Sequence, residues 1–179
     1  MDETTPAAQP SSTKKWLLIG GGIVLLLIIG SVVTGFGRGT GFGSAYFTPG
    51  VDVDQNIDGT TTYTNEEGSV TVGAGAGLPD NWPSDAPQPY TGAEILYSGT
   101  SNPATGAAGS AMVYSTSASA QSVIEYYNSR LRAEGWDVQA TSVMAGMTVL
   151  SATKDTRTFG VYAADDGQGK TSVTVGVEM

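Results

Sequence analysis

Residues 137–177, DVQATSVMAGMTVLSATKDTRTFGVYAADDGQGKTSVTVGV, contain the pattern that decides the fold. Short runs rich in β-branched residues alternate there with turn signals at 145–146, 154–157 and 165–170. In the last two runs apolar residues recur at every second position, which places them on one side of a strand and leaves Thr and Gly on the other. The stretch therefore predicts antiparallel strands with one buried and one solvated face, over 137–144, 147–153, 158–163 and 171–177.

An amphipathic helix precedes these strands. Apolar residues recur at helical spacing from Ala120 to Leu131, and the pattern predicts a helix over 117–134, capped by Ser117 and ended by Gly135. Two earlier runs, 93–98 and 110–115, favour further strands. We therefore expect residues 93–179 to form a two-layer α+β domain, in which one helix packs on an antiparallel sheet.

Two smaller segments lie upstream of this domain. Residues 51–77 are acidic and predict a β-hairpin, with strands at 60–64 and 69–72 around a turn at 65–68. Two strands alone are marginal in water, so this hairpin must lean on another part of the chain or stay mobile. Residues 78–92 contain four prolines and predict an extended strap, which Trp82 and Tyr90 would anchor to the domain.

The amino-terminal part predicts a single membrane span. No charged residue occurs from 16 to 37, and a helix over residues 16–36 would be about 30 Å long, the thickness of a bilayer core. A cleaved signal peptide and a buried core helix are the alternatives, but the apolar run is long for the first and lacks a polar side for the second. We expect a disordered cytoplasmic tail at 1–15, a transmembrane helix at 16–37 and a Gly-rich linker at 38–50.

The charges flanking the span predict its orientation. Lys14 and Lys15 precede the apolar run and Arg38 follows it, so the positive-inside rule places the amino terminus in the cytoplasm. The expected location is the cell membrane, with the bilayer contacted through residues 16–36 and the carboxyl-terminal domain outside the cytoplasm.

Composition excludes several chemistries. The 179-residue chain has no Cys and no His, so it offers no thiolate, no imidazole and no usual zinc, haem or iron–sulfur ligand set. Its formal net charge is −9, and residues 40–77 carry five carboxylates without a basic residue. Phosphate binding needs clustered Lys and Arg, so we expect no nucleic-acid partner.

One stretch resembles a metal loop. Asp54, Asn56, Asp58 and Gly59 match the first half of a calcium-binding loop, in which alternate oxygens converge on the cation. The twelfth position is Asn65 instead of Glu, and no predicted helices flank the motif, so a polar turn is the favoured interpretation. Calcium binding stays an open question at this point, and we predict no metal site and no cofactor.

Other candidate sites are weaker. Residues 166–171 (DGQGKT) resemble a phosphate-binding loop but join two predicted strands, and residues 151–154 (SATK) share the S-x-x-K spacing of serine acylases but lie within a strand. The acidic residues show no spacing that pairs two carboxylates in one pocket. Five aromatic residues could line a ligand groove but are more easily explained as core: Tyr97, Tyr114, Tyr126, Tyr127 and Trp136. We therefore predict no catalytic residue.

The motif order resembles a group of exported bacterial proteins of unknown activity. The similarity is carried by the strap pattern Leu78-Pro79, Trp82-Pro83, Asp85 and Pro87, followed by a helix that ends at Gly135-Trp136. This chain lacks the lipid-bearing Cys of the lipoprotein members, and a peptide anchor would replace it. The resemblance implies placement in the bacterial envelope and no particular chemistry.

Together these features lead us to expect a membrane-anchored, extracytoplasmic binding or envelope-interaction module that is not an enzyme. Its partner would be an envelope protein or a glycan. A small envelope hydrolase that uses carboxylates, and a structural subunit of an envelope assembly, are the alternatives.

Overall fold

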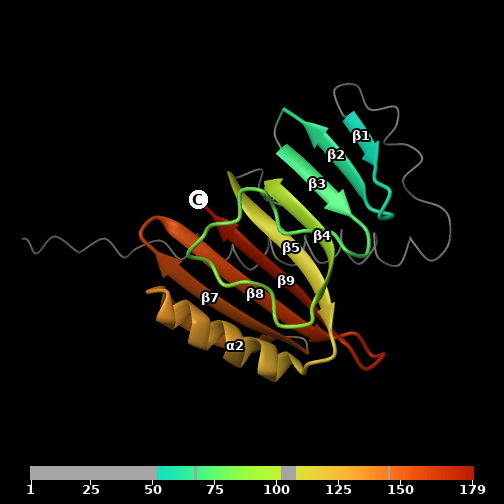
Figure 1. The fold of residues 1–179 in the computed structure, drawn as a ribbon. Coiled ribbons are helices and arrows are strands. Elements are labelled where there is room, and N and C mark those ends of the chain that lie inside the picture. Colours follow the sequence, from blue (N-terminus) through green and yellow to red (C-terminus); the bar gives the residue numbers. More distant parts are fainter. Residues whose placement is uncertain (1–51, 67, 102–107, 145) are drawn as a thin grey trace, which may run out of the picture.

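The computed structural model describes residues 52–179, except for 67, 102–107 and 145. The described strands form one nine-stranded antiparallel sheet in the order β1-β2-β3-β4-β5-β9-β8-β7-β6 (Figure 1). The elements are β1 (Asp52–Gln55), β2 (Thr61–Asn65), β3 (Gly68–Val72), β4 (Glu94–Ser101), β5 (Ala108–Thr116), α2 (Ala120–Ala133), β6 (Asp137–Met144), β7 (Met147–Lys154), β8 (Arg157–Asp165) and β9 (Thr171–Glu178).

The connection through α2 sets the strand order. Strands β1 to β5 follow one another in sequence, and α2 then carries the chain across one face of the sheet to β6 at the far edge. From β6 the chain returns strand by strand, so that β9 pairs with β5 from Gly109↔Glu178 to Thr116↔Thr171. The helix therefore lies over the strands that follow it in sequence, and it contacts β6, β7 and β8.

Local signals explain where α2 begins and ends. Ser119, two residues after the predicted cap, is the N-cap, and its Oγ accepts a hydrogen bond from the Ser122 amide at 3.2 Å. At the other end Gly135 adopts a φ of 78°, a left-handed conformation that glycine tolerates, and the Trp136 amide donates to the Leu131 carbonyl at 2.8 Å. This reversal turns Trp136 back under the helix, where it is 3% exposed.

The main core lies between α2 and the sheet. The buried face predicted for the last two strands is confirmed, because six alternate residues of β8 and β9 are at most 1% exposed; these are Phe159, Val161, Ala163, Val173, Val175 and Val177. The prediction that the other face is solvated is wrong at Thr174 of β9, which is 1% exposed. The helix contributes Val123, Ile124, Tyr127 and Leu131 to the same core. A smaller apolar cluster on β3, β4 and β5 comprises Val72, Tyr97, Ala111 and Val113.

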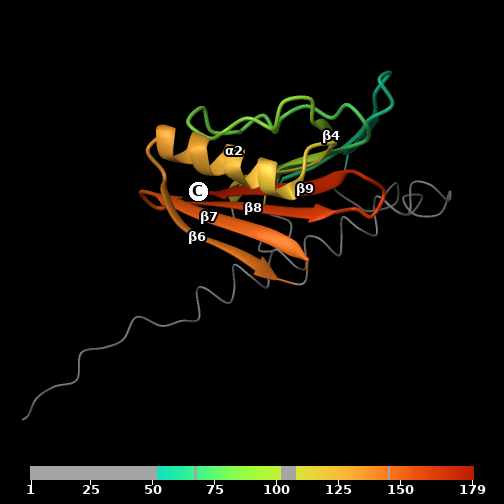
Figure 2. The ribbon, with the colours of Figure 1, turned by 90° about the horizontal axis from the view of Figure 1, so that it is seen from below.

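The proline-rich strap, residues 78–92, runs over the sheet beside α2 (Figures 1 and 2). It contains no strand, and it forms turns in which the Trp82 amide donates to the Pro79 carbonyl and the Ala86 amide to the Pro83 carbonyl. A further turn closes at its end, where the Ala93 amide donates to the Tyr90 carbonyl. Ala86 is buried in the main core, and Trp82 and Tyr90 pack against it. The strap and α2 thus share the task of covering one face of the sheet.

The predicted α+β fold class is wrong, because the described part of the chain is mostly β. Strand β3 pairs with β4 through Val70↔Gly99, Thr71↔Ser98 and Val72↔Tyr97, so the hairpin extends the same sheet instead of forming a separate unit. The physical reason is that a lone hairpin leaves edge N–H and C=O groups unpaired, whereas β4 offers them a partner. The nine strands of the sheet together contain more residues than α2, which has 14.

The predicted tail at 1–15, transmembrane helix at 16–37 and linker at 38–50 lie outside the described residues. Among residues 52–179, with the gaps noted above, no helix has the length and apolar character needed to span a membrane.

Candidate functional site

A groove of about 580 Å³ opens between the first turns of α2 and the far end of the β6–β7 hairpin. The helix side consists of Gln121, Ile124, Glu125, Asn128 and Ser129, and the sheet side consists of Thr141, Val143 and Thr148. In Figure 2, β6 is the strand of this half of the sheet that lies farthest from α2, and β7 separates β6 from β8. The groove is therefore the place where the helix and the edge of the sheet diverge.

Strand register shows which residues of the β6–β7 hairpin face the helix. Leu150 is fully buried beneath α2, and it pairs with Thr141; two residues further along, Thr148 pairs with Val143. Since side chains alternate along a strand, all four lie on the helix-facing side of the sheet. Exposure nevertheless rises along this line to 77% at Val143. A position that faces the core by register is thus left uncovered.

The groove has an apolar floor and a hydrogen-bonding rim. Ile124, which is 6% exposed, lines the groove from the helix, and Val143 lines it from the sheet. On the rim, Gln121 Nε2 donates to Glu125 Oε1 at 2.9 Å, and Asn128 Oδ1 accepts from Arg132 Nε at 2.8 Å. Among the described residues that line the groove, Glu125 carries the one carboxylate. This arrangement suits binding through apolar contact and hydrogen bonds better than acid–base chemistry, which needs paired groups.

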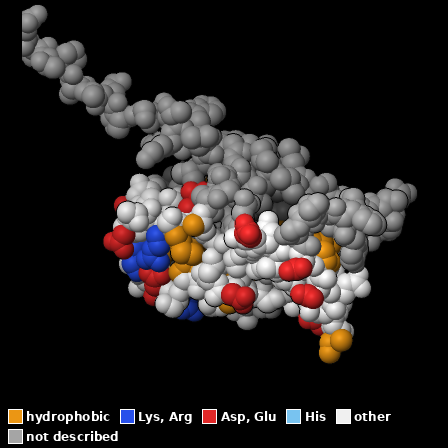
Figure 3. Space-filling view, turned by 90° about the horizontal axis from the view of Figure 1, so that it is seen from above, with side chains coloured by type: hydrophobic (Ala, Val, Ile, Leu, Met, Phe, Trp, Pro, Cys, Tyr) orange, Lys and Arg blue, Asp and Glu red, His pale blue; other side chains and the backbone are white. Residues whose placement is uncertain are grey.

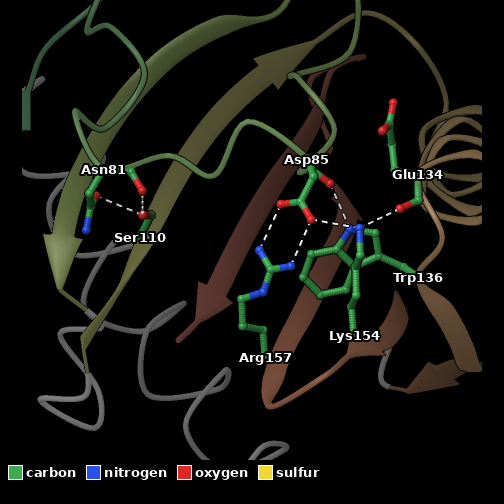
Figure 4. A network of polar contacts seen from close by, with 7 residues as sticks. All are labelled: Asn81, Asp85, Ser110, Glu134, Trp136, Lys154 and Arg157. Atoms are coloured by element: carbon green, nitrogen blue, oxygen red, sulfur yellow. Dashed lines mark hydrogen bonds and ion pairs between the residues drawn. The ribbon is translucent and has the colours of Figure 1, made fainter.

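A cluster of polar contacts fastens the strap at the opposite end of α2 (Figure 4). Arg157 donates to both carboxylate oxygens of Asp85 at 2.8 Å, and Lys154 Nζ donates to Asp85 Oδ2 at 2.7 Å. Lys154 also donates to the Glu134 carbonyl at 2.7 Å, and Trp136 Nε1 donates to the Asp85 carbonyl at 2.8 Å. The cluster joins the strap, the β7–β8 turn and the end of α2.

Charge explains the strength of this cluster. Hydrogen bonds from Arg157 and Lys154 hold the pKa of the Asp85 carboxyl well below its usual range, and Asp85 in turn raises the pKa of Arg157. The Arg157 guanidinium also lies 5.0 Å from the Trp136 ring centroid, within cation–π range. The residues satisfy one another, so we assign the cluster a structural role.

A second contact fastens the strap near its start. Asn81 Nδ2 donates to the carbonyls of Thr100 and Gly109. The Ser110 hydroxyl donates to Asn81 Oδ1 at 2.8 Å (Figure 4). Together with the Asp85 cluster, this contact holds the strap over the core by side-chain hydrogen bonds rather than by strand pairing.

The aromatic residues considered above lie in packed regions, and none lines the groove. Tyr114 and Tyr127 are fully buried, and their hydroxyls lie 3.3 Å apart. Burial raises the pKa of Tyr114 to about 12 and raises that of Tyr127 well above its ordinary value. Tyr126 donates to the Gln88 carbonyl of the strap at 3.2 Å. Their polar tips are thus used inside the protein.

The calcium-like stretch forms the turn between β1 and β2. Asp58 Oδ1 accepts hydrogen bonds from the backbone amide and the hydroxyl of Thr60, at 2.9 and 2.8 Å. The hydrogen bond from the amide is the main reason why the pKa of Asp58 is lowered. Asn56 Nδ2 donates to the Thr60 hydroxyl at 2.9 Å. Across the described residues no group of three or more acidic side chains is placed to hold a metal ion.

The other two motifs also have local explanations. Asp166 Oδ1 accepts from the amides of Gln168 and Lys170, so residues 166–170 form a closed hairpin loop between β8 and β9. Ser151 lies on β7, and Lys154 binds Asp85.

Sequence reasoning missed the groove, and only one signal pointed toward it. Val143 was assigned to a strand, but which face of that strand would be covered depends on how far α2 extends over the sheet. The uncharged, β-branched composition of 138–144 was the available signal, because an edge strand usually carries charges.

Comparison with known proteins gives one match. A family model described as START domain-like matches residues 97–174, which is less than half of the chain. The matched range includes every residue that lines the groove. Neither the curated proteins nor the solved structures that were searched contain a match.

Proposed function

We propose that the described part of the chain is a binding module and that its site is the groove between α2 and the β6–β7 hairpin. The groove's volume of about 580 Å³ lies within the ~300–1,000 Å³ typical of small-molecule sites. The match to a START domain-like model supports a ligand-binding role, because that model describes a binding type of domain and covers the whole groove.

The lining residues indicate the class of ligand. Ile124 and Val143 favour an apolar portion, and the rim amides of Gln121 and Asn128 favour a polar group at its end. Glu125 disfavours an anionic group there, as does the net charge of −9. Figure 3 shows acidic side chains spread over the viewed face, some of them beside the group of Lys and Arg side chains at its left. The proposed ligand is therefore an amphipathic molecule with a neutral or cationic polar end.

One observation carries this proposal: the 77% exposure of Val143 at a strand position that faces the helix. Single exposed apolar residues are ordinary on protein surfaces. Val143 differs because its neighbour along the same face, Leu150, is fully buried in the core. An apolar ligand in the groove would cover Val143 as α2 covers Leu150.

Binding of Nile red, a neutral apolar dye, tests the proposal. We expect saturable fluorescence enhancement with the full-length chain and an affinity at least about tenfold lower for Val143→Asp, because the new carboxylate would have to be desolvated. Ile57→Asp is the matched control, since Ile57 is fully exposed in the β1–β2 turn, away from the groove. Dye bound by residues 16–37 contributes equally to all three proteins. Equal affinities of the two variants would refute the proposal.

The wider role remains as predicted from the sequence. Membrane anchoring, the extracytoplasmic location and an envelope partner all depend on residues outside the described part. The carboxylate-hydrolase and structural-subunit alternatives stay predictions, and no specific contact in the described residues favours either.

A further inference from the structure

The two edges of the sheet differ in how they are protected. Strand β1 is four residues long and carries Asp52 and Asp54, and short, charged edges resist pairing with another strand. Strand β6 is eight residues long, and residues 138–144 contain neither a charge nor a proline. Among the described residues β6 has a neighbouring strand, β7, on one side only. Apart from Asp137 and a register shift near its start, β6 lacks the usual features that block edge pairing.

Register shows which backbone groups face outward from β6. Met144 and Met147 pair across a two-residue connection, and such a connection closes on a hydrogen-bonded pair. Hydrogen-bonded and non-hydrogen-bonded pairs alternate along an antiparallel ladder, so Val143 and Thr141 belong to the second kind. Their N–H and C=O groups therefore point away from β7, and their side chains line the groove.

We infer that two copies of this chain pair antiparallel through β6. A two-fold axis at Ser142 brings Ser142 opposite its own copy and places Thr141 of each chain opposite Val143 of the other. The outward N–H and C=O groups of Thr141 and Val143 then form the hydrogen bonds between the chains. Both side chains lie on the groove side, so each copy supplies a wall for the open edge of the other's groove. The inference goes beyond the proposed function, because backbone pairing does not require a ligand.

Three features favour a second copy over a foreign strand. The pairing segment 140–144 has no charge, so bringing two copies together opposes no like charges within it despite the net charge of −9. A foreign basic or acidic strand would find no complementary charge on the pairing segment 140–144. The Thr141–Val143 pairs are β-branched on both sides, which is a favourable cross-strand combination.

The contact is small. Pairing through about five residues per chain buries less than the ~1,200 Å² typical of stable complexes, so the dimer is expected to be weak and dependent on concentration. A covalent trap is therefore more informative than a sizing column.

The absence of Cys from the chain allows a clean trap. In the inferred pairing the two Ser142 residues form a non-hydrogen-bonded pair, with Cα atoms ~4.5 Å apart, which suits a disulfide. Full-length Ser142→Cys, oxidised at micromolar concentration, should give a covalent dimer on non-reducing gels. Gln55→Cys on the other edge of the sheet is the control and should remain largely monomeric.

A second substitution tests the hydrogen bonds themselves. Thr141→Pro in the Ser142→Cys background removes an outward N–H that β6–β7 pairing does not use, and the dimer contains two of these donors. We expect at least about a tenfold loss of crosslinking, with the melting temperature of the monomer nearly retained.

Several results would overturn the inference. They are the absence of a Ser142→Cys dimer, equal crosslinking of Gln55→Cys, and no effect of Thr141→Pro on the yield. A β6 adduct with a different protein in place of the dimer would show that a foreign strand occupies this edge.

Discussion

The layer between α2 and the sheet is closed at one end and open at the other. At the closed end the rings of Trp82, Tyr127 and Trp136 surround Phe159, with ring centroids 6.2, 5.9 and 5.6 Å from it. At the open end Thr141, Val143 and Thr148 face α2 across the groove. The same helix and the same strands form both ends. Side-chain size and the covering strap, rather than topology, therefore decide where the layer between α2 and the sheet is densely packed.

The largest expected effect comes from removing the ring at the centre of the closed end. Phe159→Ala should lower the free energy of unfolding by about 3–5 kcal/mol, because it leaves a cavity among rigid rings. Val143→Ala at the open end should change it by less than about 0.5 kcal/mol, because Val143 is 77% exposed. Urea denaturation measures both. Similar losses for the two variants would mean that the ends do not differ as described.

The Asp85 cluster lies at the closed end and should contribute less to the free energy of unfolding than Phe159 does. Asp85→Asn should cost about 1–2 kcal/mol near neutral pH, since the partners are charged but 23–31% exposed. Because the folded-state pKa of Asp85 lies below its ordinary value of 3.8, this stability is present above about pH 4 and is lost as the pH falls further. Wild type and Asp85→Asn should therefore converge in acid, as measured by urea denaturation at several pH values.

A matched control for this result is Glu94→Gln. Glu94 and Lys170 lie 3.9 Å apart, and both side chains are at least half exposed. Glu94→Gln should leave the free energy of unfolding nearly unchanged at every pH. A pH-independent loss in Asp85→Asn would assign the effect to packing of the strap instead of to charge.

Much of the sheet could be predicted from local patterns. The period-two alternation in β8 and β9 identified their buried faces, and the helical spacing of Val123, Tyr127 and Leu131 identified the buried face of α2. Local patterns did not show that β3 would pair with β4, because the strap separates the two strands in sequence. That long-range pairing is why the fold is mostly β and not α+β.

The sites depended on contacts that no local pattern contains. Asp85 meets Lys154 and Arg157 across 69 and 72 residues, so a lone acid in a proline-rich strap and two bases at a turn gave no sign of pairing. The groove depends on how α2 and β6 diverge. Strand propensity identified β6 but carried no information about its distance from the helix.

The start of α2 gives a prediction confined to the open end. Ser119→Ala removes the cap that accepts from the Ser122 amide and should cost about 1 kcal/mol. The first helical turn bears Gln121, so amide hydrogen exchange should accelerate there and remain slow around Leu131. Ser117→Ala, at the cap expected from sequence, is the control and should have little effect. The reverse result would place the helix start at Ser117.

One pair of residues on neighbouring strands locates the boundary between the two ends. Thr148 on β7 and Ala163 on β8 are directly paired and face the same side, yet Ala163 is fully buried and Thr148 borders the groove. Ala163→Leu should destabilise the protein by about 1–3 kcal/mol, because the packed core has no room for the added methylenes. Thr148→Leu should change stability by less than about 0.5 kcal/mol.

Thr148→Leu also tests whether the groove is open space or a loosely packed part of the core. If the groove is the binding site, the Leu side chain at 148 occupies part of its volume, so Nile red affinity should fall while the free energy of unfolding stays constant. If the region collapses around larger side chains, Thr148→Leu should instead stabilise the protein, because the added methylenes would be buried. Denaturation and dye titration of this single variant distinguish a groove that is kept open by the sheet from one that is merely underfilled.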